Sequence, residues 1–165
     1  GRKRSSADNV LDSGGTPVVQ VERGGDVTWH GPGQLVGYPI MMLDEARGER
    51  DVHWVLRQLE EAMIESLATT GLEAERRPKF TGVWCQGFKL VSIGVAVRSW
   101  VTYHGFAINL APELQWFHRI NPCGLAAEVM GSIASLGGEL GDEECFRSIV
   151  AEGVADALGR RITGL

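Results

Sequence analysis

Two amphipathic helical patterns enclose a run of short β-rich segments in this sequence, and this order restricts the possible folds. Apolar residues recur at helical spacing through residues 51–70, with Asp51 as the expected N-cap and Gly71 at the end. A second such pattern covers residues 142–158 and ends at Gly159. Segments with strand character lie at residues 17–22, 34–42, 82–85, 89–97 and 102–109. The pattern predicts an α+β fold, an α/β sandwich in which helices pack on a mixed, largely antiparallel sheet.

The chain of 165 residues is expected to form one domain over residues 1–165. Its net charge of -5 argues against nucleic-acid binding, which normally requires a basic surface. The apolar runs are far shorter than the ~20 residues that cross a bilayer. The basic start, residues 1–6, has no apolar stretch behind it. We therefore expect a soluble, cytoplasmic protein with no nucleic-acid or membrane partner.

The three cysteines, Cys85, Cys123 and Cys145, are widely separated in the sequence. They form no CxxC pair, so neither a disulfide framework nor a structural zinc site is expected. Cys85 lies in an apolar strand segment, and we interpret it as a core residue. In a reducing compartment at least one of these thiols is free to act as a reagent.

The segment Asn121-Pro122-Cys123-Gly124 holds a cysteine at a bend. Proline restricts the residue before it, and glycine allows the chain to turn just after the sulfur. A free thiol has a pKa of ~8.5, so it needs a nearby base or cation to act as a nucleophile at neutral pH. For a lone cysteine the more common outcome is burial as a small apolar side chain.

Lys89 and two histidines are the candidate partners of this thiol. Lys89 has apolar neighbours in the sequence that would desolvate it, and such a lysine can take the thiol proton. The alternative is a lysine at the end of a strand that extends into water. His30 and His104 titrate near neutrality and are the other candidate bases. A metal site from His30, His104 and Cys123 is conceivable, but no ligand spacing supports it, so no metal is expected.

A glycine-rich segment covers residues 23–34. Glycine is needed where the backbone adopts positive φ or lies close against a ligand. The arginine, threonine and histidine among these glycines predict a ligand-lining loop, although the spacing of phosphate-binding loops is absent. The alternative is a tight hairpin whose polar groups satisfy one another.

Several motifs, in order and covering about residues 1 to 136, resemble the lipoyl(octanoyl) transferases of lipoate biosynthesis. They are Arg23-Gly-Gly-Asp-Val-Thr-Trp-His-Gly-Pro-Gly-Gln-Leu-Val-Gly-Tyr-Pro39, Thr81-Gly-Val-Trp84, Lys89-Leu-Val-Ser-Ile-Gly94, Thr102-Tyr-His-Gly-Phe-Ala-Ile-Asn109 and Asn121-Pro-Cys-Gly124. The resemblance implies the catalytic fold of biotin and lipoate ligases. It also implies octanoyl transfer through an acyl-cysteine thioester, the first step of protein lipoylation, without ATP or a cofactor.

The same resemblance implies roles for particular residues and partners. Cys123 matches the family's nucleophile, and Lys89 matches the lysine that activates it. The expected donor is octanoyl-acyl carrier protein, and the expected acceptors are lipoyl domains of 2-oxoacid dehydrogenases and the glycine cleavage H protein. The chain is expected to be a monomer. The positions that match the substrate-binding residues are Arg23, Gly24, Gly25, Asp26, Val27, Thr28, Trp29, His30, Ser92, Ile93, Gly94, Gly105, Phe106 and Ala107.

Two other functions remain open on the sequence. The first is an ATP-dependent lipoate or biotin ligase on the same fold. The second is a non-catalytic, carrier-binding relic, because family members carry roughly a strand and a loop before the segment that residues 1–11 resemble. The basic clusters Arg2-Lys3-Arg4 and Arg76-Arg77-Pro78-Lys79 are either solvated surface charge or a docking patch for an acidic partner.

Overall fold

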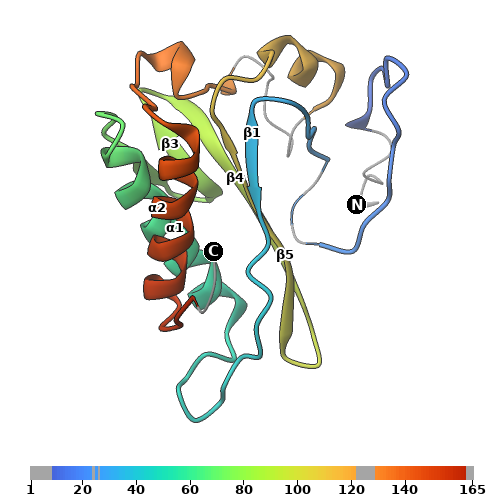
Figure 1. The fold of residues 1–165 in the computed structure, drawn as a ribbon. Helices are drawn as coiled ribbons and strands as arrows, with labels where there is room; N and C mark the ends of the chain where they lie inside the picture. The colour runs from blue at the N-terminus through green and yellow to red at the C-terminus, as the bar shows by residue number, and fades with distance from the viewer. Residues whose placement is uncertain (1–8, 24, 26, 122–128, 163–165) are drawn as a thin grey trace.

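The computed structural model describes residues 9–23, 25, 27–121 and 129–162. Its centre is a sheet with the strand order β1-β5-β4-β3-β2, in which every pair of neighbours is antiparallel. The strands are β1 (Gln34–Gly37), β2 (Glu75–Arg77), β3 (Phe80–Cys85), β4 (Phe88–Arg98) and β5 (Val101–Asn109). The helices α1 (Val52–Ala68) and α2 (Glu143–Ala157) pack together on one face of the sheet (Figure 1). The predicted α+β sandwich with a largely antiparallel sheet is confirmed.

Both helices begin where the sequence predicts. The Asp51 carboxylate accepts a hydrogen bond from the His53 N–H at 2.8 Å, and Asp142 accepts one from the Cys145 N–H at 2.8 Å. These bonds satisfy donors that a helix start leaves unpaired. The apolar face of α1 is fully buried, through Val55, Leu59, Ala62, Met63 and Leu67. No helix in the described part of the chain is long and apolar enough to cross a membrane.

The predicted strand at residues 17–22 is wrong, and the predicted strand at residues 34–42 is only partly right. Residues 17–22 alternate in polarity but form no strand, and Val18 and Val19 are exposed. Alternation alone does not make a strand, because its backbone groups need a paired neighbour. The predicted strand 34–42 is regular only over β1. Pro39 has no N–H to donate, and the chain rejoins β5 through a single bridge between Met42 and Val101.

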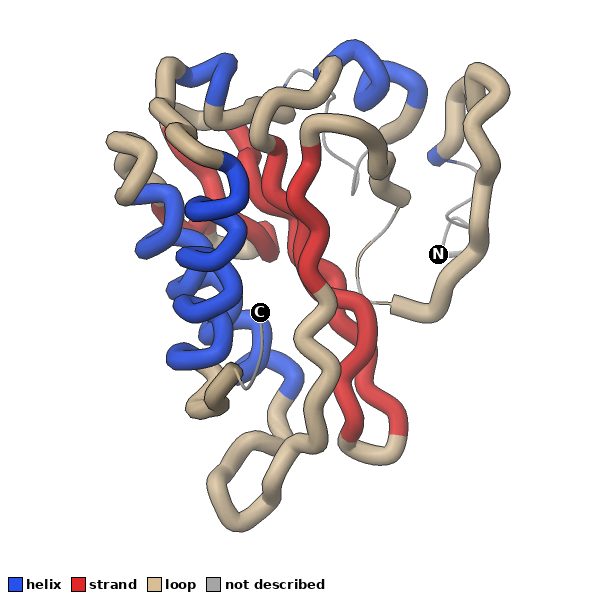
Figure 2. Tube along the Cα trace, viewed as in Figure 1, coloured by secondary structure: helices blue, strands red, loops and turns tan. Residues whose placement is uncertain are grey.

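A second, smaller apolar cluster lies apart from the helix layer. It centres on Phe117, Ile120 and Met130, with Val27, Trp29 and Leu114 packed against it. Figure 2 shows the loops and the short 3₁₀ helix η2 (Leu114–Arg119) that carry much of it, away from α1 and α2. The sequence pattern does not predict η2, the short helix η5 (Ala134–Leu136) or β2, because elements this short show no periodicity.

Candidate functional site

A bulge between β3 and β4 decides where the Lys89 side chain points. Val83 lies opposite Val91 and Trp84 lies opposite Lys89, so β4 carries one extra residue, Leu90, between these pairs. Such an insertion changes which side chains share a face of the sheet. Val91 belongs to the core beneath the helices, whereas Lys89 contacts its cross-strand neighbour Trp84. Lys89 therefore lies on the face opposite α1 and α2, which we name the Lys89 face.

The side chain of Lys89 is buried, with only 4% of its surface exposed. Its Nζ lies 5.9 Å from the centroid of the Trp84 ring, and the Arg77 guanidinium lies 4.7 Å from the same centroid. Gly82, at φ 123, leaves room for the lysine, because a Cβ there would lie 2.7 Å from Lys89 Cε. The predicted burial of Lys89 is confirmed, and the alternative of a lysine that extends into water is wrong.

The predicted nucleophile, Cys123, lies outside the described residues, but its flanks can be placed. The described chain stops after Asn121 and resumes at residue 129. There Met130 forms a parallel bridge with Lys89, and the Gly131 N–H donates to the Lys89 carbonyl oxygen at 3.0 Å. The chain is thus hydrogen-bonded to β4 at Lys89 from residue 130 onward, soon after Cys123 in the sequence.

Small residues of β4 and β5 share the Lys89 face. Ser92 pairs with Ala107, and Gly94 pairs with Gly105, on the face opposite the core residues of these strands. The structure therefore brings four of the predicted substrate-binding residues onto the same face as Lys89. None of them carries a side chain larger than that of serine.

Ile93 and Phe106 lie on the other face. They pair with each other across β4 and β5, and both side chains belong to the main core under the helices. Only their backbone atoms are available for a ligand on the Lys89 face. Their prediction as substrate-binding residues stays a prediction.

The glycine-rich segment is anchored by aromatic packing. The Trp29 ring is stacked on Trp116 at a centroid distance of 6.0 Å and meets Phe117 edge to face at 5.5 Å. These contacts hold the segment against η2. Arg23, Gly25, Val27, Thr28 and His30 are also described, whereas Gly24 and Asp26 are not.

A chain of hydrogen bonds joins His30 to the neighbourhood of Lys89. His30 Nδ1 lies 3.2 Å from Gln34 Oε1, and Gln34 Nε2 donates to Asn109 Oδ1 at 2.8 Å. Asn109 Nδ2 then donates to the Gly131 carbonyl oxygen at 2.8 Å, and the Gly131 N–H donates to the Lys89 carbonyl oxygen. Sequence reasoning did not single out Gln34 or Asn109. Both are polar residues at the ends of apolar strands, which could have marked their positions in the sequence but not the bond between them.

The electrostatic surroundings of His30 favour a neutral ring. His30 is an exposed residue, but nearby protein atoms desolvate the imidazole, and this lowers its pKa below the ordinary value. The hydrogen bond with Gln34 raises the pKa, and the nearby charge of Arg23 lowers it further. Together these effects favour the uncharged form of the ring at neutral pH.

The second candidate base, His104, lies away from Lys89. It pairs with Val95, six residues along β4 from Lys89, which corresponds to roughly 20 Å. Its ring contacts Tyr38 and Tyr103 instead. Among the described residues no three metal-binding side chains come together, and Cys123, the third member of the conceivable metal site, lies outside these residues.

The two described cysteines differ in reactivity. Cys85 is buried in the core, as predicted, and burial raises the pKa of its thiol, with Glu73 and Glu75 adding to the effect. It is therefore held as an unreactive thiol. Cys145 is exposed on α2.

The basic cluster at residues 76–79 carries less free charge than the sequence suggests. Arg76 forms ion pairs with Glu60 and Glu61, and Arg77 covers the Trp84 ring. Residues 2–4, the other basic cluster, lie outside the described chain. A docking patch for an acidic partner stays a prediction.

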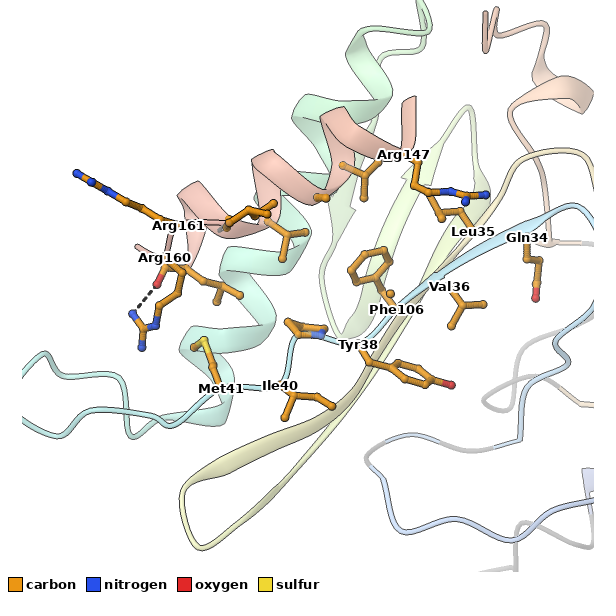
Figure 3. A pocket seen from close by; sticks show the side chains of 18 residues that line it. Gln34, Leu35, Val36, Tyr38, Ile40, Met41, Phe106, Arg147, Arg160 and Arg161 are labelled. Carbon is orange, nitrogen blue, oxygen red and sulfur yellow. Dashed lines mark hydrogen bonds between the residues drawn. The ribbon is translucent and has the colours of Figure 1, made fainter. Parts of the chain in front are cut away.

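A cavity of about 610 Å³ lies between β1 and α2. Figure 3 shows Phe106 pointing toward α2 within it, whereas Tyr38 points to the other side of β1. The cavity is therefore on the helix side of the sheet, opposite Lys89.

The fold and this site agree with one family of catalytic domains. The model of the lipoyl protein ligase A/B catalytic domain matches residues 3–157. The chain belongs to this family, as the motifs in its sequence indicated.

Curated relatives of this chain are octanoyltransferases. An octanoyltransferase of Nostoc punctiforme is 53% identical over 124 residues, which cover 75% of this chain and 53% of the relative. An octanoyltransferase of Geobacter metallireducens is 53% identical over 138 residues, covering 82% of this chain and 63% of the relative. The chain thus spans little more than half the length of such relatives.

Solved structures agree on the fold. A lipoate protein ligase of Thermoplasma acidophilum with bound lipoic acid has a TM-score of 0.77 at 15% identity, covering 96% of this chain and 67% of its own. Biotin protein ligase of Aquifex aeolicus has a TM-score of 0.53 at 16% identity, covering 77% and 53%. The predicted biotin and lipoate ligase-like architecture is confirmed.

Proposed function

We propose that this chain transfers an octanoyl group from octanoyl-acyl carrier protein to a lysine of a lipoyl-carrier domain, as the first step of protein lipoylation. The observation that carries the proposal is the placement of Lys89. It is buried on the face opposite the helices, and its backbone is bonded to the chain that follows Cys123. The 53% identity with two octanoyltransferases supports the same activity over the ATP-dependent ligases, because the solved lipoate ligases are only 15–18% identical to this chain.

In the first half of the reaction, Lys89 takes the thiol proton of Cys123. The thiolate attacks the carbonyl carbon of the donor thioester, and the bond between that carbon and the carrier sulfur breaks. The proton on Lys89 passes to the leaving carrier thiolate. Exchange of one thioester for another is nearly thermoneutral, so no nucleotide is required.

In the second half, the acceptor amine attacks the acyl-Cys123 carbonyl carbon. The carbon–sulfur bond breaks and the amide bond forms. Lys89, now neutral, takes the proton that the amine nitrogen loses, and passes it to the Cys123 thiolate. Backbone N–H groups near Gly94 or Gly124 would stabilise the oxyanion, and removal of one such donor typically costs ~10²–10³ in rate.

The acyl tail is proposed to lie along the small residues of the Lys89 face, among them Ser92, Gly94 and Ala107. Each methylene that it buries contributes about 0.8 kcal/mol, so the depth of this slot would discriminate between chain lengths. Cytoplasmic location, a monomeric state, and lipoyl domains or the H protein as acceptors belong to the same proposal.

Intact-mass spectrometry after incubation with octanoyl-acyl carrier protein tests the proposal. We expect an octanoyl adduct on Cys123 that a lipoyl domain discharges, with no ATP added. Cys123→Ser is the control and should give no thioester adduct. ATP consumption with full turnover in Cys123→Ser would favour the ligase. Lipoyl-domain binding without an adduct in repeated experiments would favour the carrier-binding relic.

A further inference from the structure

The hydrogen-bond chain from Gly131 to His30 has ends of fixed polarity. At one end the Gly131 carbonyl oxygen can only accept, and it takes its bond from the Asn109 side chain at 2.8 Å. At the other end the Gly31 backbone N–H can only donate, and it donates to Gln34 Oε1 at 3.3 Å. The Asn109 side chain is almost completely buried, so water does not replace the partners of this amide.

These ends fix both amides and then the histidine. Because Gly131 needs a donor, Asn109 presents its NH₂ there and its oxygen toward Gln34. Gln34 must therefore present its NH₂ to Asn109 and its oxygen to His30 and the Gly31 N–H. A hydrogen bond between this oxygen and His30 Nδ1, at 3.2 Å, then requires the hydrogen to be on Nδ1.

We propose that the chain Gly131–Asn109–Gln34 holds neutral His30 as the Nδ1–H tautomer, so that Nε2 accepts a hydrogen bond from the acceptor amine. Nδ1–H is the less populated tautomer of histidine in water, so the protein must select it. Desolvation and the charge of Arg23, which lower the pKa of His30, support a neutral ring. Gln34 and Asn109 are positioning residues in this account, because they act through the histidine.

This role rests on the proposed acyl transfer and assigns a direction to one contact. A ring nitrogen that carries no hydrogen cannot donate to the carbonyl oxygen of the acyl group. It can accept a hydrogen bond from the N–H of an incoming amine and orient the nitrogen lone pair toward the thioester. His30 thus serves the second half of the reaction, and the transfer of the proton itself remains with Lys89.

Two-bond ¹H–¹⁵N correlation spectra of histidine rings test the tautomer without any substrate, with His30→Asn used for assignment. At pH 8 the wild type should show the Nδ1–H pattern. Gln34→Glu should keep this pattern because a carboxylate oxygen still accepts a hydrogen bond from Nδ1, and Gln34→Met should lose it because methionine offers only a weak acceptor. The control Thr102→Val removes the hydrogen bonds of buried Thr102 with Pro39 and Met41, at the other end of β4 and β5, and should leave the pattern unchanged. An Nε2–H pattern in the wild type, or an unchanged pattern in Gln34→Met, would overturn the proposal.

The role in transfer is tested by measuring the two half-reactions separately. His30→Asn keeps an N–H for Gln34 but has no counterpart of Nε2. Discharge of the acyl-enzyme to a lipoyl domain should slow about tenfold, the worth of one hydrogen bond, while acyl-enzyme formation changes much less. Equal slowing of both steps would overturn the assigned role. If the wild type forms no acyl-enzyme, the proposed function fails together with that role, whereas the spectra still decide the tautomer.

Discussion

One glycine makes room for the Lys89 side chain, and its substitution is the most specific test at the scale of residues. An alanine Cβ at position 82 would lie 2.4 Å from the Val91 carbonyl oxygen and 2.7 Å from Lys89 Cε. We expect Gly82→Ala to lower the free energy of unfolding by about 1–3 kcal/mol, because the φ of 123° is strained for alanine, and to slow acyl-enzyme formation. Urea unfolding and intact-mass time courses measure the two effects.

Gly87→Ala is the matched control in the same hairpin. Gly87 also has a positive φ, of 86°, but no atom lies within 4 Å of an added Cβ. This variant should lose stability through backbone conformation alone and keep its transfer rate. Equal loss of transfer in the two variants would show that contact with Lys89 is not the reason.

The sequence predicts the burial of Lys89 but not the direction of its side chain. Apolar neighbours indicate burial because they are local in the chain. The direction depends on the extra residue Leu90 opposite β3, and hence on a pairing register that alternation within one strand does not reveal. For the same reason the roles of Gln34 and Asn109 appear only when β1 and β5 are placed side by side.

At the scale of elements, Glu49 joins the end of α2 to the segment before α1. Its buried carboxylate accepts hydrogen bonds from Arg160 at 2.9 and 2.6 Å, which lower the pKa of Glu49 to about 2 against the opposing effect of burial. A lowered carboxyl pKa stabilises the fold above the unfolded value of about 4.5, and this contribution is lost as the pH falls toward 2. It amounts to at most about 3 kcal/mol, less what solvent screens at the partly exposed Arg160.

Glu49→Gln should therefore lower the free energy of unfolding at pH 7. Between pH 4.5 and pH 2 the free energy of unfolding of the variant should fall less than that of the wild type, because the variant has no carboxylate at this position to protonate. Urea unfolding at several pH values measures both effects. The control Glu45→Gln changes a carboxylate that is 76% exposed and should have little effect. A pH dependence in Glu49→Gln as steep as that of the wild type would contradict this account.

The elements themselves differ in how far the sequence predicts them. Both helices have a long repeat and an aspartate cap, so their positions are correct within a residue or two. The segment at residues 17–22 has the alternation of a strand, but no described strand lies beside it. A strand is completed by its neighbour, and that neighbour is not encoded locally.

At the scale of the whole molecule, we expect the acyl chain to bind on the Lys89 face of the sheet and not in the cavity on the helix side. The cavity between β1 and α2 is lined by Ala151, whereas Ala107 lies on the Lys89 face. We expect Ala107→Leu to shift acyl-enzyme formation toward chains shorter than octanoyl, because added volume shortens the proposed slot. Ala151→Leu should leave octanoyl transfer unchanged. Competition between acyl-carrier donors of different length measures the shift, and the reverse pattern would move the slot to the helix side.

The family and the fold could be predicted from the sequence because ordered motifs cover most of the chain. The geometry between the motifs could not. The chain meets itself at Met130 and Lys89, about 40 residues apart, through contacts that no single motif contains. That meeting joins Lys89 to the part of the chain that follows Cys123 in the sequence.

The most direct test of the central claim, that Lys89 activates Cys123, is the rate at which each thiol is alkylated by iodoacetamide. Site-resolved mass spectrometry at pH 7 compares the wild type with Lys89→Met, with buried Cys85 and exposed Cys145 as internal references. We predict that Cys123 reacts fastest in the wild type and slows at least about tenfold in Lys89→Met, while Cys145 is unaffected. A Cys123 that reacts no faster than Cys145, at the same rate in both proteins, would contradict the claim.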